Sequence, residues 1–166
     1  MFSFYNKHNN NLYNKLVELS RNIYFYKKLS LKDSFETRVI LIFLHFSIIL
    51  ININQRKKTK FPQNVFDNIF LNVEYHLREI GHGDVSVNKK MKILNKIFYD
   101  ILLRINSGKE SNFVINKLIV KNHLSMNGNV KSQYIDKISL YLEDFYNYCF
   151  ELDDNSMIEG KINFKY

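Results

Sequence analysis

The chain has 166 residues, of which 46% are hydrophobic, so it is long enough to form one domain with a sizeable buried core. One proline and five glycines leave few helix breakers, which argues against a protein built from many short strands. The single cysteine, Cys149, excludes an intramolecular disulfide and a cysteine-based metal site. We therefore expect a single all-α domain over residues 1–166, a compact bundle of about six or seven helices.

The net charge of +8 is spread unevenly along the sequence. Residues 1–130 carry 20 basic and 9 acidic side chains, whereas residues 131–166 carry 4 basic and 7 acidic ones. The 19 lysines far outnumber the 5 arginines, although nucleic-acid sites favour the forked guanidinium group of arginine. The chain lacks alanine and is rich in the residues that AT-rich codons encode. Charge alone therefore does not establish a nucleic-acid-binding function.

Two helices are predicted in the first third of the chain. In residues 11–29, leucines recur at helical spacing, and Ile23 is the last member of their stripe. Asp33 or Ser34 can cap a second helix, which contains the apolar run Val39–Ile53. This run is shorter than the roughly 20 mostly apolar residues of a membrane span, and polar side chains interrupt it. We expect it to be a buried core helix.

Two amphipathic helices joined by a glycine turn are predicted in the middle of the chain. The first begins after Pro62 and ends before Gly81, since glycine readily adopts the left-handed conformation that follows a helix C-terminus. Asp84 or Ser86 can cap the second helix. The expected apolar stripes are Val65, Phe66, Ile69, Phe70, Val73 and Leu77 in the first helix, and Val87, Met91, Leu94, Phe98, Ile101, Leu102 and Ile105 in the second.

The last third of the chain predicts one short helix and one long one. After the polar break NSGKESN, the apolar residues Phe113, Ile115 and Leu118 indicate a short helix, which ends before a turn at Met126–Asn129. The final helix is expected to span Ser132 to Leu152 and to bury an aromatic stripe. We expect the tail that follows to be either an ordered extension or a loose end.

The glycine-rich turn at residues 81–84 does not fit a known phosphate-binding loop. Walker loops and dinucleotide-binding loops both follow a strand, whereas a predicted helix precedes these glycines. His76 and His82 lack the second histidine or carboxylate at i, i+4 spacing that helical zinc sites use. We predict no metal site and no nucleotide cofactor, and interpret the segment as a turn between two helices.

His45 and Cys149 are the remaining candidates for chemistry. His45 lies in the most apolar predicted helix, where a hydrogen-bonded core residue is the favoured interpretation and a haem or metal ligand is the alternative. Cys149 lies in an aromatic stretch without an accompanying base, so we interpret it as a packing residue. The sequence therefore predicts neither an enzyme nor a cofactor.

Charged residues gather at the ends of the predicted central helices. They are Glu36, Arg38, Arg78, Glu79 and Asp84. Because isolated buried charges are costly, these side chains must be paired or face solvent. Two compatible interpretations stay open, namely ion pairs that hold the helices together and a charged rim around a protein-docking surface. We also expect Arg78 and Glu79 to face Lys89 and Lys90 across the turn.

Three stretches of the sequence each contain a distinctive motif, and the three motifs are considered together. The first reads NIYFYKKLSLKDSFETRVILIFLHFSIIL, in which a Phe-Tyr pair precedes an acidic loop, an acid-x-Arg motif and a Leu-His pair. The second reads VFDNIFLNVEYHLREIGHGDVSVNKKMKILNKIFY, in which Leu-Arg-Glu leads into Gly-x-Gly-Asp and then into a helix that starts with Lys-Lys and closes with Phe-Tyr. The third is the Gly-basic-x-x-Phe ending at Gly160 and Phe164.

Together these stretches resemble the ubiquinol–cytochrome c chaperones, which are assembly factors of the cytochrome bc1 complex. The chain departs from the family's pattern in having Asn72-Val73-Glu74 where Asp-Met-Asp is usual, and His82 where an apolar residue is more common. The matching positions are Phe25, Tyr26, Asp33, Glu36, Arg38, Leu44, His45, Phe66, Asp67, Phe70, Leu77, Arg78, Glu79, Gly81, Gly83, Asp84, Val87, Lys89, Lys90, Met91, Phe98 and Tyr99.

The resemblance implies a non-enzymatic, all-helical assembly chaperone that binds newly made cytochrome b. It further implies a small partner subunit and contact with the ribosome, and no small-molecule substrate. We expect a soluble bacterial factor that is cytoplasmic and peripheral to the inner membrane. The expected partner-binding residues are Glu36, Arg38, Asp67, Glu74, Arg78, Glu79, Gly81, Gly83, Asp84, Lys89 and Lys90.

Two alternative functions follow from the residues themselves. A basic RNA- or ribosome-associated binding protein would bind RNA in a salt-dependent way. A helical protein that handles haem or quinone would depend on His45. The lysines that the first alternative would use are Lys57, Lys58, Lys60, Lys89 and Lys90.

Overall fold

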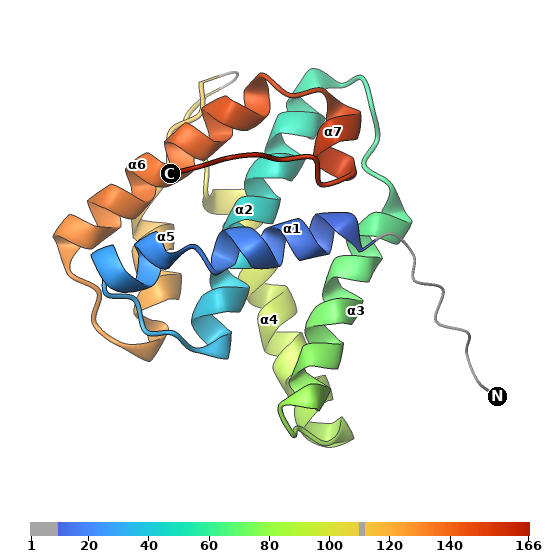
Figure 1. The fold of residues 1–166 in the computed structure, drawn as a ribbon, viewed down its shortest axis with the longest axis vertical. Helices are drawn as coiled ribbons and strands as arrows, with labels where there is room; N and C mark the ends of the chain where they lie inside the picture. Colours follow the sequence, from blue (N-terminus) through green and yellow to red (C-terminus); the bar gives the residue numbers. More distant parts are fainter. Residues whose placement is uncertain (1–9, 110–111) are drawn as a thin grey trace.

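A computed structural model describes residues 10–109 and 112–166 and confirms the all-α fold (Figure 1). Within this part of the chain, helices form around one core, and the only extended pairing is a single bridge between Asn106 and Ile115. The α-helices are α1 Asn11–Ser20, α2 Phe35–Arg56, α3 Gln63–Glu79, α4 Asp84–Arg104, α5 Lys117–Leu124, α6 Ser132–Phe150 and α7 Asp154–Ile158. A π-helical turn, η1, spans Tyr24–Lys28, and a 3₁₀ turn, η2, spans Ser125–Asn127.

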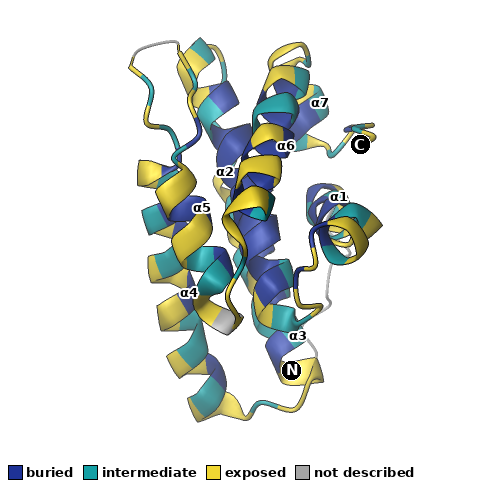
Figure 2. Ribbon diagram, turned by 90° about the vertical axis from the view of Figure 1, so that its left-hand side faces the viewer, coloured by how far each residue is buried: buried dark blue, intermediate teal, exposed yellow. Residues whose placement is uncertain are grey.

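Helix α2 is the central element of the fold. Its N-terminus is capped by the side chain of Ser34, which accepts a hydrogen bond from the backbone N–H of Thr37 at 3.2 Å. Helices α1, α4 and α6 all pack against it, and α2 is dark blue along most of its length in Figure 2. By length and composition α2 could cross a membrane, but 83% of its most apolar window is buried inside the protein. The expected core helix is therefore present.

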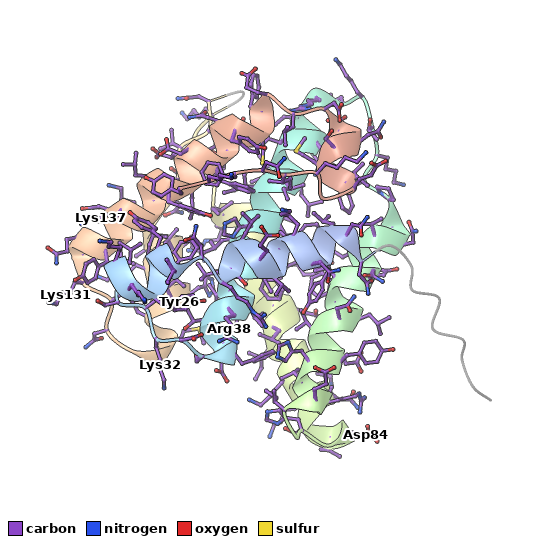
Figure 3. All side chains as sticks on the ribbon, in the orientation of Figure 1. Tyr26, Lys32, Arg38, Asp84, Lys131 and Lys137 are labelled. Carbon is purple, nitrogen blue, oxygen red and sulfur yellow. The ribbon has the colours of Figure 1, made fainter. Side chains whose placement is uncertain are left out.

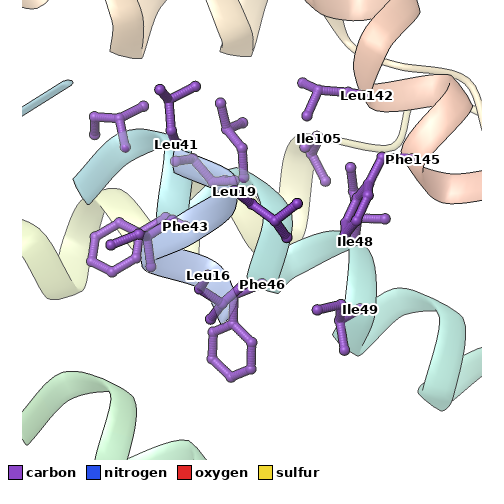
Figure 4. Packing of buried hydrophobic residues seen from close by; sticks show 14 of the residues in the cluster. Leu16, Leu19, Leu41, Phe43, Phe46, Ile48, Ile49, Ile105, Leu142 and Phe145 are labelled. Carbon is purple, nitrogen blue, oxygen red and sulfur yellow. The ribbon is translucent and has the colours of Figure 1, made fainter. Parts of the chain in front are cut away.

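The core is formed by aliphatic and aromatic side chains from both ends of the sequence. Figure 4 shows Leu16 and Leu19 of α1 and Leu142 of α6 gathered around α2, all of them buried. Ile105, just after α4, closes the cluster on another side. Removing such side chains from water is the main favourable contribution to folding, at about 25 cal/mol per Å² of apolar surface.

The first helix is shorter than the sequence predicted. Helix α1 ends at Ser20, and Ile23 is 59% exposed, so the prediction that Ile23 extends the leucine stripe was wrong. The chain then widens into the π-helical turn η1, which places Phe25 in the core instead. A π-turn advances the side chains differently from the 3.6-residue period on which the prediction relied.

The segment before α5 is extended rather than helical. Ile115 pairs with Asn106 in the bridge, and helix α5 begins only at Lys117, capped by the side chain of Asn116. Phe113 therefore precedes the helix, and Leu118 is exposed within it. The predicted short helix is present and buries Ile119 and Leu124, but the prediction that it includes Phe113 and Ile115 was wrong, because these two residues lie in the bridge segment.

The C-terminal tail is an ordered extension. Asp153 caps α7, and Arg56 at the end of α2 binds Asp154 at 2.9 Å and donates to the carbonyl oxygens of Cys149 and Phe150 at the C-terminus of α6. The rings of residues 164 and 166 then pack edge-on against the ring of Tyr141. One arginine thus connects α2, α6 and α7.

The turn between α3 and α4 confirms Gly81 as the residue that ends a helix. Gly81 has φ +102°, its N–H bonds to the carbonyl of Arg78, and the N–H of His82 bonds to the carbonyl of Leu77. This pair of bonds defines a Schellman motif, which satisfies two carbonyl groups at the end of α3. The expected side-chain cap of α4 was wrong, since Gly83 occupies the N-cap position.

The two candidate caps of α4 have other partners. Asp84 lies in the first turn of α4, where its carboxylate pairs with Arg78. Its negative charge also interacts favourably with the positive end of the helix dipole. Ser86 shares a hydrogen bond of 2.9 Å with the ring of His82. The turn is therefore held by side-chain pairs that cross it rather than by a serine or aspartate cap.

Candidate docking groove between α3 and α4

An open groove of about 610 Å³ runs between α3 and α4. Residues of α3 form one wall, and residues of α4 at positions 88, 92, 95 and 99 form the other. These four positions follow the spacing of one helix face, so a continuous strip of α4 faces the groove. The lining residues are Phe66, Asp67, Phe70, Leu71, Glu74, Asn88, Met91, Lys92, Asn95 and Tyr99.

The floor of the groove is an aromatic layer supported by the core. Phe66 and Phe70 are only half-buried, and their ring centroids lie 5.8 Å and 5.0 Å from that of Phe98, which is completely buried. Phe98 in turn contacts Phe43 and Phe46 of α2 at 5.3 Å and 5.6 Å. Such aromatic pairs hold ring positions closely, so the groove floor is rigid.

The lips of the groove expose apolar surface. Leu71 is 39% exposed and Tyr99 is 48% exposed, and they lie on opposite helices. A floor of half-buried rings with exposed apolar lips is typical of surfaces that bind an apolar segment of another protein.

The α3 wall of the groove is acidic. Asp67 and Glu74 are seven residues apart, which places them on the same helix face about 10 Å apart along the axis. Gln63 donates to Asp67 at 2.8 Å, and Arg78 donates to Glu74 at 3.2 Å. Both carboxylates keep oxygen atoms available for a partner, because a carboxylate accepts several hydrogen bonds.

The departure from the family's pattern at residues 72–74 has a simple structural explanation. Glu74 faces the groove, whereas Asn72 points to the other side of α3. There its amide donates to the backbone and side chain of Asn68 at 2.8 Å and to Asn10, just before α1, at 3.4 Å. Of these two positions, only residue 74 lines the groove in this chain, and its acidic side chain is a glutamate, which is longer than the usual aspartate.

Two of the predicted partner-binding residues line a second, smaller pocket. Glu36 and Lys90 lie at a pocket of about 120 Å³, whose apolar lining includes Leu77, Ile93 and Ile97. It lies on the face of α4 that looks towards α5, so α4 separates the two hollows. A pocket of this size accommodates one large apolar side chain.

The remaining predicted residues do not form one site. Arg38 pairs with Asp33 at 2.6 Å beside the start of α2, well away from the groove. Lys89 is exposed, and among the described residues neither it nor Lys90 forms an ion pair with Glu79.

Arg78 binds acids instead of facing the lysines. Its guanidinium group pairs with Asp84 across the turn and with Glu74 on α3, and these hydrogen bonds raise its pKa. The expectation that Arg78 and Glu79 face the two lysines was therefore wrong. The pairs join α3 to α4, so the ion-pair interpretation of these charges holds at this turn.

His45 is a core residue rather than a ligand. Its Nδ1 lies 2.6 Å from the carbonyl oxygen of Leu41, which can only accept, so Nδ1 carries the hydrogen and donates. Nε2 lies 2.8 Å from the hydroxyl of Tyr141 and accepts from it. Burial lowers the pKa of His45 to about 4. Since both ring nitrogens are engaged, the haem-ligand interpretation of His45 has no free lone pair to use.

Cys149 is a packing residue, as predicted. It is completely buried, and this burial raises the pKa of its thiol to about 12. A thiol with so high a pKa is neutral at physiological pH and is a poor nucleophile. Across residues 10–109 and 112–166, no group of three or more metal-binding side chains comes together.

The sequence matches the model of one protein family over most of its length. Residues 27–164 match the family described as ubiquinol–cytochrome c chaperone. The chain belongs to the ubiquinol–cytochrome c chaperone family. Among proteins with curated descriptions, none matches this sequence.

A solved structure has the same fold. The crystal structure of the Cbp3 homologue from Brucella abortus is similar to this chaperone with a TM-score of 0.67. The two sequences are 21% identical, and the match covers 94% of this chain and 87% of that chain. At this level of identity the likeness shows the fold and leaves the site to be argued from this chain's own residues.

Sequence reasoning assigned only two of the ten groove residues of this chaperone, Asp67 and Glu74, to partner binding. Four others matched the family's pattern but had no predicted site role, namely Phe66, Phe70, Met91 and Tyr99. Leu71 was not assigned to any site, and neither were Asn88, Lys92 and Asn95 on the opposite wall. The signal was available in part, because residues 88, 92, 95 and 99 recur at helical spacing on a face of α4 that is not the core face. Without knowledge that α3 lies beside that face, the spacing alone does not indicate a groove.

Proposed function

We propose that this chaperone holds a segment of newly made cytochrome b in the groove between α3 and α4 until the segment enters the bc1 complex. One observation carries the proposal. The groove is lined by residues of the family's central motif from both helices, namely Phe66, Asp67, Phe70, Met91 and Tyr99, together with Glu74. Residues that match the family's pattern and line an open groove support a role in recognition in addition to packing.

The shape of the groove supports binding to one face of a helix. A volume of about 610 Å³ accommodates several side chains but not a whole membrane-spanning helix of about 20 residues. An amphipathic helix places its apolar side chains into such a groove at i, i+3 and i+4 spacing and leaves its other face outside. Covering that face in water prevents the newly made segment from aggregating.

We further propose that the protein works at the cytoplasmic face of a bacterial inner membrane, where cytochrome b is inserted. The excess of basic residues over residues 1–130 supports contact with an anionic surface. The small partner subunit and the ribosome contact that the family resemblance implies stay predictions, as does the absence of catalysis.

The test is crosslinking and recovery of the chaperone from membranes that are synthesising cytochrome b. Leu71→Asp places a charge on the lip of the groove, and we expect it to reduce recovery of cytochrome b at least tenfold, because an unpaired carboxylate is costly to bury in the complex. Leu103→Asp is the matched control, since Leu103 is 78% exposed on α4 and does not line the groove. Equal recovery by both variants and the unaltered protein would contradict the groove assignment.

A further inference from the structure

Five exposed lysines lie at the end of the molecule opposite α3. Figure 3 shows Lys32, Lys131 and Lys137 along one edge, far from Asp84 at the tip of the α3–α4 turn. Lys27 and Lys28 belong to the π-helical turn η1 at the same end, which lies beside the start of α6 in Figure 1. We call this set of five lysines the basic end.

Packing brings these three segments of the chain together. The loop at Lys32 and the loop just before α6, at Val130, line the same small hollow. The ring of Tyr24 in η1 stacks on that of Tyr141 in α6, with 6.3 Å between centroids. Lys28 and Lys137 each lie four residues, about one helical turn, from one of these two tyrosines. The basic end is therefore a product of the tertiary fold and not of a basic run in the sequence.

The lysines of the basic end are not neutralised within the protein. Among the described residues, none of the five forms an ion pair. The two neighbouring aspartates are held by other cations, because Asp33 pairs with Arg38 at 2.6 Å and Asp136 pairs with Lys117 at 2.9 Å. Lys57, Lys58 and Lys60 of the α2–α3 loop are also exposed and form no ion pair among the described residues, but they are neighbours in sequence, whereas the basic end gathers free positive charge from three separate segments.

We propose that the basic end binds the anionic headgroups of a lipid bilayer. The five lysine side chains are flexible point charges that suit a fluid layer of phosphates, and the choice of a bilayer over RNA rests on the apolar side chains exposed near them. Two apolar side chains are exposed near it. Ile23, just before η1, is 59% exposed. Met126 in η2 is 60% exposed and lies in sequence between Leu124 and Gly128, which line the same small hollow as Lys32. Apolar side chains among lysines match the composition of surfaces that lie at a membrane interface.

This inference rests on the proposed location at the cytoplasmic membrane and names the surface that makes the contact. With the basic end on the bilayer, the groove wall α3 remains on the opposite side of α2 in the view of Figure 1. Membrane contact and client binding would thus use separate surfaces of one molecule, so each can be removed without the other.

The test is co-sedimentation of the full chain with lipid vesicles. One set of vesicles contains phosphatidylcholine with phosphatidylglycerol, and the other contains phosphatidylcholine alone. The triple variant Lys28→Gln, Lys32→Gln and Lys131→Gln should weaken binding to the anionic vesicles roughly 100-fold, since each lysine near such a surface is worth about fivefold. Raising the salt from about 0.1 M to about 0.5 M should also release the unaltered protein.

The control removes the same charge from another place. The triple variant Lys57→Gln, Lys58→Gln and Lys60→Gln alters exposed lysines of the α2–α3 loop and should bind the anionic vesicles within a few-fold of the unaltered protein. Equal losses in both triple variants, or no preference for anionic vesicles, would overturn the proposal. So would RNA that binds more tightly than the vesicles and depends on the same three lysines. Recovery of cytochrome b in detergent reports on the groove separately and should not change in either triple variant.

Discussion

The interior around α2 and the groove between α3 and α4 are built from the same kinds of side chain and differ in how completely those side chains are covered. In α2, Phe43 and Phe46 are fully buried, and the polar His45 has partners for both ring nitrogens. In the groove, Phe66 and Phe70 contact the core through one side only. The difference in coverage supports the proposal that the apolar surface left open beside the core is a binding surface.

Phe98 joins the two regions, and its replacement should have the largest effect. Phe98→Ala removes a fully buried ring that supports both the core and the groove floor, so we expect it to lower the free energy of unfolding by about 3–5 kcal/mol. Urea denaturation measures this. Leu103→Ala, one turn further along α4 and exposed, should change it by less than about 0.5 kcal/mol. Similar losses in both variants would show that Phe98 does not support the core as described.

The buried His45, which is hydrogen-bonded to Tyr141, should make the stability of the protein depend on pH. The unfolded state protonates His45 near pH 6.5 and the folded state only near pH 4, so the unfolded state binds more protons between these values and stability falls as the pH is lowered. We expect His45 to account for about 3 kcal/mol of the loss between pH 7 and pH 4.

Urea denaturation across that pH range tests the contribution of His45. The variant His45→Leu cannot protonate at this position, so its stability should change much less between pH 7 and pH 4. The variant also leaves the hydroxyl of Tyr141 without its partner, so the informative quantity is the slope with pH and not the absolute stability. An unchanged slope would show that the histidine is not held neutral by burial.

The turn at the tip of the groove should be sensitive to a single methyl group. Gly81→Ala places a side chain at φ +102°, where the backbone of an L-residue is strained, and should cost about 1–2 kcal/mol. Nothing lies within 4 Å of the added carbon, so the cost would come from the backbone and not from a clash. Gly83→Ala is the control, because its φ of −78° is ordinary and its surroundings are equally open.

The smallest effect on stability is expected on the lip of the groove. Leu71→Ala should change the free energy of unfolding by less than about 0.5 kcal/mol, because the side chain is already 39% exposed and packs at the groove's edge. Ile69→Ala, two residues earlier on the same helix but 1% exposed, should cost about 2–5 kcal/mol. A large loss for Leu71→Ala would mean that the lip belongs to the core and not to a binding surface.

Helix periodicity predicted the core better than it predicted the groove, and the reason is physical. The spacing of Phe66 and Phe70 is the same as that of Ile69 and Val73, so the apolar stripe of α3 looks uniform in the sequence. Which side of the stripe is covered depends on how α3 packs against α1 and α4, and that arrangement is set by side chains distant in sequence. The fold class was therefore predictable, whereas the open side of α3 was not.

Local chemistry was predictable where one residue decides the geometry. Gly81 ends α3 as expected because few other residues adopt positive φ, and Ser34 caps α2 because its hydroxyl satisfies a free N–H group. The cap of α4 was not predictable in the same way. Gly83 occupies it without a side-chain bond, while Asp84 is drawn to Arg78 on the preceding helix. A contact between helices overrode the local preference there.

The most direct test of the account is photo-crosslinking from the lip of the groove. A photoreactive amino acid is placed at residue 71, or at residue 103 as the control, and the chaperone is irradiated in membranes that are synthesising cytochrome b. The account predicts a crosslink to newly made cytochrome b from residue 71 and little or none from residue 103. Equal crosslinking from both positions, or none from residue 71 while cytochrome b is still recovered with the protein, would contradict it.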